Sequence, residues 1–578
     1  MIKLATIREM LSLILLCSLL GMLNAQQIDR LVIGESSDVD KLNPLTNFSA
    51  TGSYINEYLF SSLLRTDKAT GKFVPILAEG LPKISEDELT YNYVLNSAAK
   101  FNSGKKITAE DVVFSLKLVK NHLVNNSQKR IHYTAVREAV AGENGNVEIK
   151  LRKQSAQGLR ITSDFAILSE DFFDPEKKLR EISFTELENV NALSAERLAS
   201  LQLVAARVNA FGTGRKTFNN DATCGPYLLS EWTVNQKIVL VVNKKFWGRK
   251  IGKQNMFFAQ NVANLEFQVI SDPKKIRTSI FQGSVDLFTS LPADLYFELS
   301  DIPKLQNSYI FHSPPQNSYD YIGMNMRGEE RGRSAVLADV KVRKAMAHLV
   351  DVELLLERVR FGLGERIAAE YPSYRPGFRN TDLELVAYDI AKAKELLAQA
   401  GWKDGNGNGL LDKEIKGETV EFVLECIYNE NTAARALIAE ELQKVAREAG
   451  VLISVVALPW KEYISRLQKG DFDLAIGAWV SDPNEDTYAQ IWHRKNWGGG
   501  SNFVGFGDAE SDALIEAYDA TLDEENRKSI SLKVQKKMWD LQPYIFLWVN
   551  THCIVVRKSN EAANIYNYRP GFWLGEWK

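Results

Sequence analysis

The chain has 578 residues, of which 70 are basic and 73 are acidic, so its formal net charge is −3. Its length exceeds what one hydrophobic core ordinarily organises, and we expect about two to four domain-sized units. The near-balance of charge lacks the basic surface of a nucleic-acid-binding protein, so we expect no nucleic-acid partner. Hydrophobic residues make up 45% of the chain and charged residues 25%, which is ordinary for a folded, water-soluble protein.

The N-terminal segment has the pattern of an export signal. Lys3 and Arg8 precede an uncharged, mostly apolar run over residues 10–23, which is followed by Ala25. This run is short for a bilayer-spanning helix, which needs about 20 residues. A basic start, a short apolar stretch and a small residue at the cut are typical of a secretory signal peptide. We therefore expect residues 1–25 to be removed by cleavage near Ala25.

The remaining chain alternates β-branched runs with amphipathic helices, which indicates an α/β fold. One helix is predicted to begin at Thr108, because Asp111 stands three residues later as in a capping box and apolar residues follow at helical spacing. A second helix is predicted from Asp389 to a stop at Gly401. A third is expected around residues 193–208.

A short local unit occurs twice along the chain. In each copy a helical stretch ends at a glycine, and a strand that contains the sequence Val-Asp-Leu or Phe-Asp-Leu follows. The two copies comprise residues 276–282, Gly283 and 284–288, and residues 459–469, Gly470 and 471–476. One interpretation is a common helix ending that arose twice, and the other is two lobes built from similar α/β units.

The sequence lacks several motifs that mark common classes of enzyme. Its six histidines form no H-E-x-x-H pattern, and G-x-S-x-G, the Walker A motif and G-x-G-x-x-G are all absent. An exported hydrolase would need a nucleophile paired with a base, and we find no such pair. We expect that the protein is not an enzyme and holds no cofactor.

Signals for metal binding and disulfides are weak. Residues 404–409 read Asp-Gly-Asn-Gly-Asn-Gly, as at the start of a calcium loop, but Ile415 occupies the place of the bidentate glutamate. We favour a glycine- and asparagine-rich surface turn there and expect no metal site. Cys224, Cys426 and Cys553 remain after export, and one disulfide with a spare thiol or three buried thiols are both open.

Several segments, in order along the mature chain, resemble family 5 extracellular solute-binding proteins, the peptide- and nickel-binding receptors of ABC importers. The segments are Leu42-Asn43-Pro44, Tyr58-Leu59-Phe60-Ser61-Ser62-Leu63, Pro75-Ile76-Leu77-Ala78-Glu79, Phe101-Asn102-Ser103-Gly104, Thr108-Ala109-Glu110-Asp111-Val112-Val113-Phe114-Ser115, Cys224-Gly225-Pro226-Tyr227, Phe281-Gln282-Gly283, Tyr321-Ile322-Gly323-Met324-Asn325, Val342-Arg343-Lys344-Ala345, residues 388–402 and Asp482-Pro483.

The resemblance implies a periplasmic binding protein-like α/β fold of type II, cluster C. Two lobes with an extra subdomain would enclose a ligand cleft and close about a hinge. The implied division is a lobe I core of residues 26–58, 222–310 and 544–578, a lobe I extension of residues 59–221, and a lobe II of residues 311–543.

The resemblance also implies a function. The protein would be a monomeric periplasmic receptor that captures a small peptide and delivers it to the permease subunits of an ABC transporter. A metal chelate or an oligosaccharide would be the alternative ligand in the same fold.

Candidate ligand-binding residues follow from the resemblance and from the chemistry of an extended peptide. The charged N-terminus of a peptide needs a carboxylate once water is excluded, and the matching residue here is Asp482, with Glu485 and Asp486 nearby. Trp479 would lie against ligand side chains, and Asn325, Tyr54 and Asn502 would hydrogen-bond the ligand.

Other assignments stay open. The partner of the ligand carboxylate is one of Arg327, Arg366 and Arg375. A metal chelate would point to His493, and a sugar would stack on Trp492 or Trp497. Residues 108–115 match the family strongly but have the pattern of helix capping and packing, so we exclude them from the site.

Overall fold

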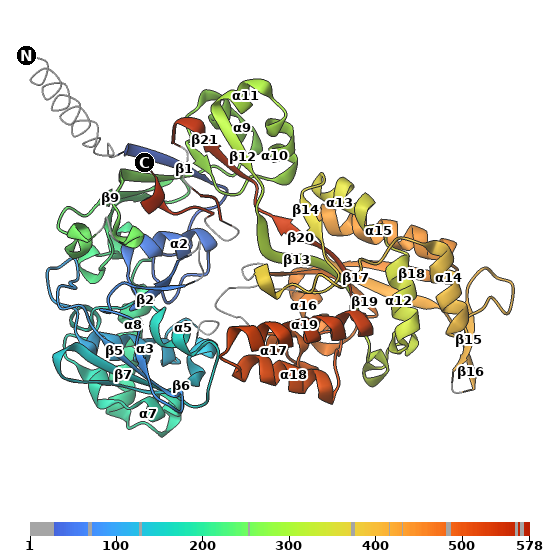
Figure 1. The fold of residues 1–578 in the computed structure, drawn as a ribbon, viewed down its shortest axis with the longest axis horizontal. Coiled ribbons are helices and arrows are strands. Elements are labelled where there is room, and N and C mark those ends of the chain that lie inside the picture. Colours follow the sequence, from blue (N-terminus) through green and yellow to red (C-terminus); the bar gives the residue numbers. More distant parts are fainter. Residues whose placement is uncertain are drawn as a thin grey trace, which may run out of the picture.

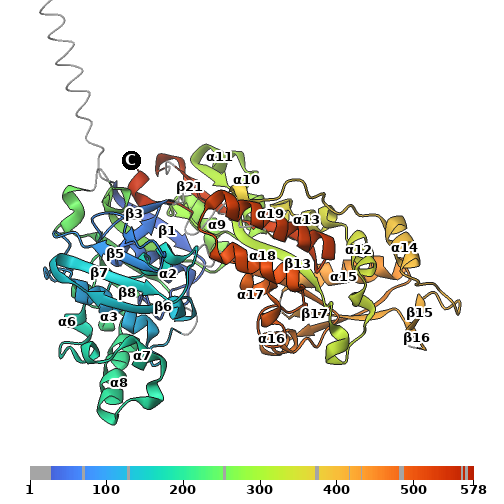
Figure 2. The ribbon, with the colours of Figure 1, turned by 60° about the horizontal axis from the view of Figure 1, so that its bottom comes forward.

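A computed structural model describes residues 28–67, 72–126, 130–251, 255–370, 376–415, 417–430, 432–480, 487–560, 564–566 and 571–577. Within these ranges no helix is long and apolar enough to cross a membrane. Figure 1 shows two lobes lying side by side, and Figure 2 gives a turned view of the same chain. The predicted export signal and Asp482, Glu485, Asp486 and Arg375 lie outside the described residues.

The first lobe is built on a mixed seven-stranded sheet. Its strand order is β12-β21-β11-β1-β10-β9-β8. The central strand β1 runs parallel to both of its neighbours, β10 and β11. The bounds are β1 Ile28–Glu35, β8 Tyr227–Thr233, β9 Lys237–Val242, β10 Val262–Val269, β11 Leu287–Phe288, β12 Tyr309–His312 and β21 Ile554–Arg557. The helices that accompany this sheet are α2 Ala50–Leu59, α9 Pro273–Gln282, α10 Ala293–Ser300 and α11 Pro303–Ser308.

An extension of the first lobe lies below this sheet in Figure 1. It is a four-stranded antiparallel sheet of order β4-β5-β7-β6 with helices packed on it. Its strands are β4 Lys83–Ile84, β5 Thr90–Val94, β6 Val136–Ala141 and β7 Asn146–Leu151, next to the small pair β2 Leu64–Thr66 and β3 Phe73–Pro75. Its helices are α3 Ala109–Lys120, α5 Gly158–Ser163, α6 Glu170–Phe173, α7 Phe184–Glu188 and α8 Ala195–Ala210. The helix expected around residues 193–208 is therefore confirmed as α8.

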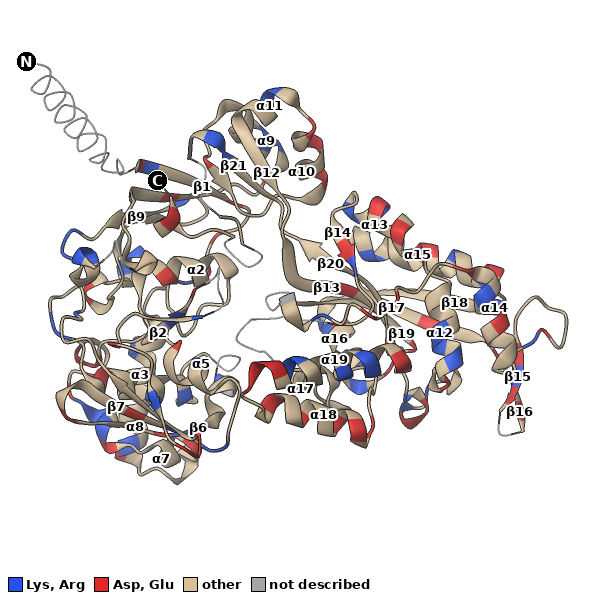
Figure 3. Ribbon diagram, in the orientation of Figure 1, with Lys and Arg blue, Asp and Glu red and all other residues tan. Residues whose placement is uncertain are grey.

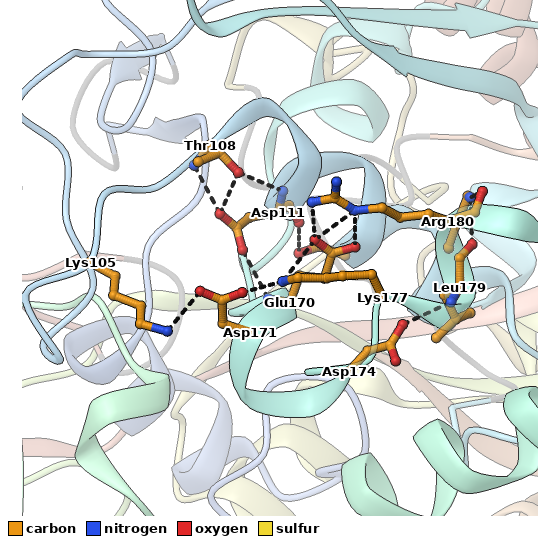
Figure 4. Close-up of polar contacts among 11 residues, drawn as sticks. Lys105, Thr108, Asp111, Glu170, Asp171, Asp174, Lys177, Leu179 and Arg180 are labelled. Carbon is orange, nitrogen blue, oxygen red and sulfur yellow. Dashed lines mark hydrogen bonds and ion pairs between the residues drawn. The ribbon is translucent and has the colours of Figure 1, made fainter.

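The helix predicted from Thr108 is confirmed as α3, and its first turn has a structural role (Figure 4). The Thr108 amide donates to Asp111 Oδ2 (2.9 Å), and the Glu170 amide donates to Asp111 Oδ1 (2.9 Å). Arg180 in turn makes a forked ion pair with Glu170 (2.6 Å). Desolvation raises the pKa of Asp111, and these donors offset part of that effect. The first turn of α3 thus fastens residues 170–180 onto this helix.

The second lobe is built on a six-stranded sheet of order β14-β20-β13-β19-β17-β18. Here β17 runs parallel to β18 and β19, whereas β13 is antiparallel to β19 and β20. The bounds are β13 Pro315–Met324, β14 Gly364–Arg366, β17 Val423–Asn429, β18 Leu452–Leu458, β19 Leu474–Val480 and β20 Tyr544–Thr551, and a separate hairpin pairs β15 Asp412–Ile415 with β16 Glu418–Glu421.

Helices cover both faces of this six-stranded sheet. Because side chains alternate along a strand, Ile322 and Met324 of β13 enter one hydrophobic core, and Tyr319 and Tyr321 enter the other. The helices of this lobe are α12 Val340–His348, α13 Val352–Arg360, α14 Ile390–Gln399, α15 Ala433–Glu448, α16 Trp460–Lys469, α17 Ala489–Trp492, α18 Ala509–Ala520 and α19 Glu524–Leu541. The helix predicted from Asp389 is confirmed as α14, with Asp389 as its N-cap and Gly401 at a φ of +86° just beyond its end.

The two copies of the local unit lie one in each lobe. Gly283 ends α9 at a φ of +65°, and Gly470 ends α16 at a φ of +67°, a left-handed conformation that glycine adopts without steric penalty. The aspartate three residues later has the same role in both copies. Asp286 accepts a hydrogen bond from the Val32 amide of β1 (2.9 Å), and Asp473 accepts one from the Glu425 amide of β17 (2.8 Å). This shared geometry favours the interpretation of similar α/β units in two lobes.

The chain passes between the two sheets at β12–β13 and again at β20–β21. These two crossings run side by side, since the His552 amide donates to the Pro314 carbonyl (2.8 Å) and the Gln316 side chain donates to the Thr551 carbonyl (2.8 Å). The expected boundary at residue 544 precedes β20, which lies in the six-stranded sheet, so the return crossing falls after residue 551. The lobes also meet where the Ala156 amide donates to the Asp519 carbonyl (3.1 Å).

Charges are distributed over both lobes. Figure 3 shows Lys and Arg interspersed with Asp and Glu in each lobe. The loop of residues 404–409 makes turn contacts of its own: Asp404 accepts from the Gly409 amide (3.0 Å), and Asp412 accepts from the Gly405 amide (2.8 Å). These contacts fit the surface turn that the sequence favours.

Cys224, Cys426 and Cys553 are free and buried, so of the two arrangements left open the structure has three separate thiols. Burial raises the pKa of Cys224 and Cys426 to about 12 and that of Cys553 to about 11. Thiols of this kind stay protonated and unreactive near neutral pH.

Candidate functional site: the strand ends of the two lobes

The parallel strands of each sheet have their carboxyl ends at one edge, which is the candidate place for a ligand. In open α/β sheets, ligands bind beyond the carboxyl ends of the parallel strands. In the first lobe, β1 ends at Glu35 and β11 ends at Phe288. In the second lobe, β17 ends at Asn429 and β19 ends at Val480. The candidate site therefore consists of these two edges.

At the edge of the first lobe, hydroxyl groups converge on a buried carboxylate. Glu35, the last residue of β1, is 5% exposed. It accepts hydrogen bonds from the hydroxyls of Tyr54 and Thr51 on α2 and of Thr289, the residue after β11; the Thr51 and Thr289 contacts measure 3.2 and 2.9 Å. Burial and the neighbouring Glu35 raise the pKa of Tyr54 well above its ordinary value, so Tyr54 remains a neutral donor.

At the edge of the second lobe, four aromatic rings form a continuous stack. Tyr544 lies 4.0 Å from Tyr321 between ring centroids, Tyr321 lies 6.3 Å from Trp479, and Trp479 lies 5.5 Å from Phe503. The indole nitrogen of Trp479 donates to the Tyr544 hydroxyl (3.2 Å). Trp479 is only partly buried and Val480 is 80% exposed, so the stack reaches the surface at the end of β19. Such a surface offers a ligand rigid apolar contact, and the hydrogen bond to Tyr544 fixes the orientation of the Trp479 indole.

A second buried carboxyl lies beside this stack. Glu370, which follows β14, is 8% exposed. Its Oε2 accepts hydrogen bonds from the Tyr319 hydroxyl (2.9 Å) and from the indole nitrogen of Trp492. Burial raises the pKa of Glu370 to about 7, and the two hydrogen bonds lower it only in part.

Two of the predicted ligand-binding residues lie at these edges. Tyr54 contacts Glu35 at the edge of the first lobe, and Trp479 belongs to the stack at the edge of the second. Asp482 lies outside the described residues, two positions beyond the end of β19. The role of these residues in binding stays a prediction.

The two predicted asparagines serve the protein's own backbone. The Asn325 amide donates to the carbonyls of Gly470 (3.0 Å) and Phe472 (2.8 Å), and its oxygen accepts from the Arg327 amide (3.2 Å). Asn502 both donates to the Phe506 carbonyl (3.0 Å) and accepts from the Phe506 amide (2.9 Å). Each side chain is 1% exposed. Because these contacts use the polar groups of both residues, we do not carry them into the proposed site.

The other candidates from the sequence are engaged within the second lobe. Arg327 donates to the carbonyls of Gly505 and Gly507, and Arg366 pairs with Glu353. His493 lies 3.4 Å from Asp512 and 3.1 Å from Glu516, which ties α17 to α18. Trp492 is buried against Glu370, and Trp497 donates to Glu330 (3.1 Å).

Sequence reasoning missed Glu35 and Glu370. A signal existed for Glu35, since it is an acidic residue just after the apolar run Leu31-Val32-Ile33. No local pattern marks Glu370, whose partners stand 51 and 122 residues away along the chain.

Comparison with known proteins agrees with this architecture. The oligopeptide-binding protein AppA of Bacillus subtilis is 26% identical over 551 residues, covering 94% of this chain and 90% of that protein. The structure of AppA from Bacillus subtilis in complex with a nonapeptide superposes with a TM-score of 0.66 at 23% identity, covering 96% of this chain and 99% of that one. NikA from Brucella suis in complex with Fe(III)-EDTA superposes with a TM-score of 0.71 at 18% identity, covering 95% and 99%.

These structural likenesses show the two-lobed fold of periplasmic binding proteins. The sequence pattern described as bacterial extracellular solute-binding proteins, family 5 Middle, matches residues 72–501. The chain belongs to the family 5 bacterial extracellular solute-binding proteins, a family of receptors rather than enzymes.

Proposed function

We propose that this protein captures a small peptide between its two lobes and delivers it to the permease of an ABC importer. The observation that carries the proposal is the similarity to an oligopeptide-binding protein along 94% of the chain. Peptide binding by strand-like contacts ignores most side chains, which suits a receptor for mixed nutrients. The partly exposed stack at Trp479 offers an apolar surface for a ligand side chain.

Closure of the lobes is part of this proposal. The paired crossings at β12–β13 and β20–β21 give the chain a narrow double connection, which is the arrangement about which two domains rotate in a hinge motion. The lobe division would follow these crossings, with the extension formed by residues 59–221. Export by removal of residues 1–25 and a monomeric state belong to the same proposal, and the intact mass of the secreted protein tests the cleavage.

Asp482 is the proposed partner of the peptide N-terminus, because an ammonium group removed from water needs a carboxylate. Isothermal titration calorimetry with peptides of two to five residues tests this role. We expect Asp482→Ala to weaken binding by at least about thirtyfold, equivalent to about 2 kcal/mol. Glu485→Ala and Asp486→Ala are matched controls in the same segment and should change affinity less than about threefold.

Two outcomes would contradict the proposal. If native mass spectrometry of the purified protein found a sugar or a metal chelate as the co-purified ligand, the ligand class would be wrong. Unchanged peptide affinity in Asp482→Ala would reject the assignment of that residue, and a large loss in Asp486→Ala instead would move it by four positions.

A further inference from the structure

Glu370 is a buried carboxyl held beside the strand end at which Trp479 reaches the surface. Its hydrogen-bond donor Tyr319 stands directly opposite Trp479 in the antiparallel pairing of β13 with β19. Directly opposed residues point to the same face of a sheet. Through Tyr319, the carboxyl of Glu370 is held on the same face of the sheet as Trp479 and at the same position along the strands.

A second aromatic contact also connects Glu370 to the same stack. Trp492, its second donor, lies 4.8 Å from Tyr544 between ring centroids. Tyr544 in turn accepts the hydrogen bond of the Trp479 indole (3.2 Å). Glu370 is therefore a buried acidic group connected through Trp492 and Tyr544 to the aromatic stack at the end of β19.

The charge of Glu370 has no counterpart among the described residues. Both of its donors are neutral and both act on Oε2, and no donor in the described part of the chain reaches Oε1. The titratable groups that face it are Tyr319 on β13 and Tyr544 on β20, and burial raises the pKa of both, so they stay neutral. A carboxylate buried without a cation is strongly disfavoured, and an arriving cation would remove that penalty.

We infer that Glu370 forms an anionic subsite at the edge of the second lobe that receives the positively charged side chain of a lysine or arginine in the bound ligand. The inference rests on the proposed function, because it assigns the side-chain preference of a peptide receptor. Asp482 serves the peptide N-terminus, which every peptide carries, whereas Glu370 distinguishes one side chain from another.

Matched tripeptides test this subsite. Each pair contains lysine or its uncharged isostere norleucine at the first, second or third position, with alanine elsewhere, so the termini are the same in both members. At pH 8 we expect the full-length mature protein to bind the lysine peptide at least about tenfold more tightly than its partner at one position. In Glu370→Gln, which keeps an acceptor for Tyr319 and Trp492, this preference should fall to about twofold or less.

A second measurement uses the unaltered protein. At pH 7 a large fraction of Glu370 carries a proton, and pairing with lysine expels it. Calorimetry in two buffers of different ionisation enthalpy should therefore detect proton release with the favoured lysine peptide and none with the norleucine peptide. Glu365→Gln, five residues away on β14 and paired with Arg379 at the surface, is the control and should retain both the preference and the proton release.

The outcomes separate the two proposals. If norleucine peptides bind and no position prefers lysine, this inference fails while peptide binding stands. It also fails if the preference survives in Glu370→Gln, or if that variant weakens both members of a pair equally, since the residue would then have a structural role. If no peptide binds to the unaltered protein, both proposals fall.

Discussion

The two copies of the α-to-β unit share their framework and differ at the edge they support. In both lobes a glycine ends the helix, and an aspartate three residues later accepts the amide of the neighbouring parallel strand. In the first lobe β11 has two residues and leads at once to Thr289, which donates to Glu35. In the second lobe β19 has seven residues and ends in the stack around Trp479.

The residues that stabilise each sheet are therefore the same in both lobes, whereas the residues at the strand ends differ. The glycine and the aspartate join helix to strand, so either lobe needs both. The edges have different chemistry: Glu35 meets three hydroxyl donors, whereas Glu370 has two donors on a single oxygen. We therefore expect equivalent substitutions in the framework to have similar effects, and substitutions at the edges to differ.

The largest expected effect concerns the paired aspartates. Asp286→Ala removes the acceptor of the Val32 amide, and Asp473→Ala removes that of the Glu425 amide. A buried amide without an acceptor is costly, so each change should lower the free energy of unfolding by about 3 kcal/mol in urea denaturation. The exposed Asp301→Ala should change it by less than about 0.5 kcal/mol. If one of the two aspartates cost less than about 1 kcal/mol, the units would not be equivalent.

The next effect is a pH dependence of the free energy of unfolding, caused by Glu370 at the edge of the second lobe. The pKa of Glu370 is raised from 4.5 to about 7, so the folded state binds this proton more tightly than the unfolded state does. Its stabilising contribution is therefore complete below pH 4.5 and is lost as the pH rises toward 7. Between pH 5 and pH 8 the protein should lose about 2 kcal/mol of unfolding free energy relative to Glu370→Gln.

Urea denaturation of both proteins across this pH range measures that difference. The Glu365→Gln variant, at a surface ion pair on the preceding strand, should follow the pH profile of the unaltered protein. Parallel profiles for the unaltered protein and Glu370→Gln would show that Glu370 titrates at an ordinary pKa, and its special position at this edge would be disproved.

The smallest effect concerns the two helix-ending glycines. Alanine at Gly283 or Gly470 must adopt a left-handed φ, which costs about 1 kcal/mol in thermal or urea unfolding. A Cβ at Gly283 would approach the flexible end of Arg557 (2.8 Å), and one at Gly470 would approach the ring of Trp497 (2.8 Å). Gly470→Ala should therefore be the more harmful of the two. Gly80→Ala, where a Cβ meets open space, is the control, and a neutral result at Gly470 would contradict the comparison.

Local signals predicted the framework, whereas the contacts of the candidate site residues depend on the tertiary structure. The capping residues Thr108 and Asp389 and the stop at Gly401 acted as expected, because helix ends depend on neighbours in the sequence. Asn325 and Asn502 were expected to reach the ligand, yet their amides bind the protein's own carbonyls. Which groups an amide bonds depends on the segment folded against it, and neither local pattern nor family resemblance contains that information.

The sequence by itself determined the α/β class, the helix ends, the repeated unit and the membership of a solute-binding family, since these follow from periodicity, capping chemistry and motifs read in order. Only the tertiary structure decided which side chains meet. Glu370, Tyr319 and Trp492 are far apart along the chain and come together because β13, the segment after β14, and α17 pack on one face of the six-stranded sheet. Their burial and the raised pKa of Glu370 arise from that packing, and so does the proposed preference for a basic side chain.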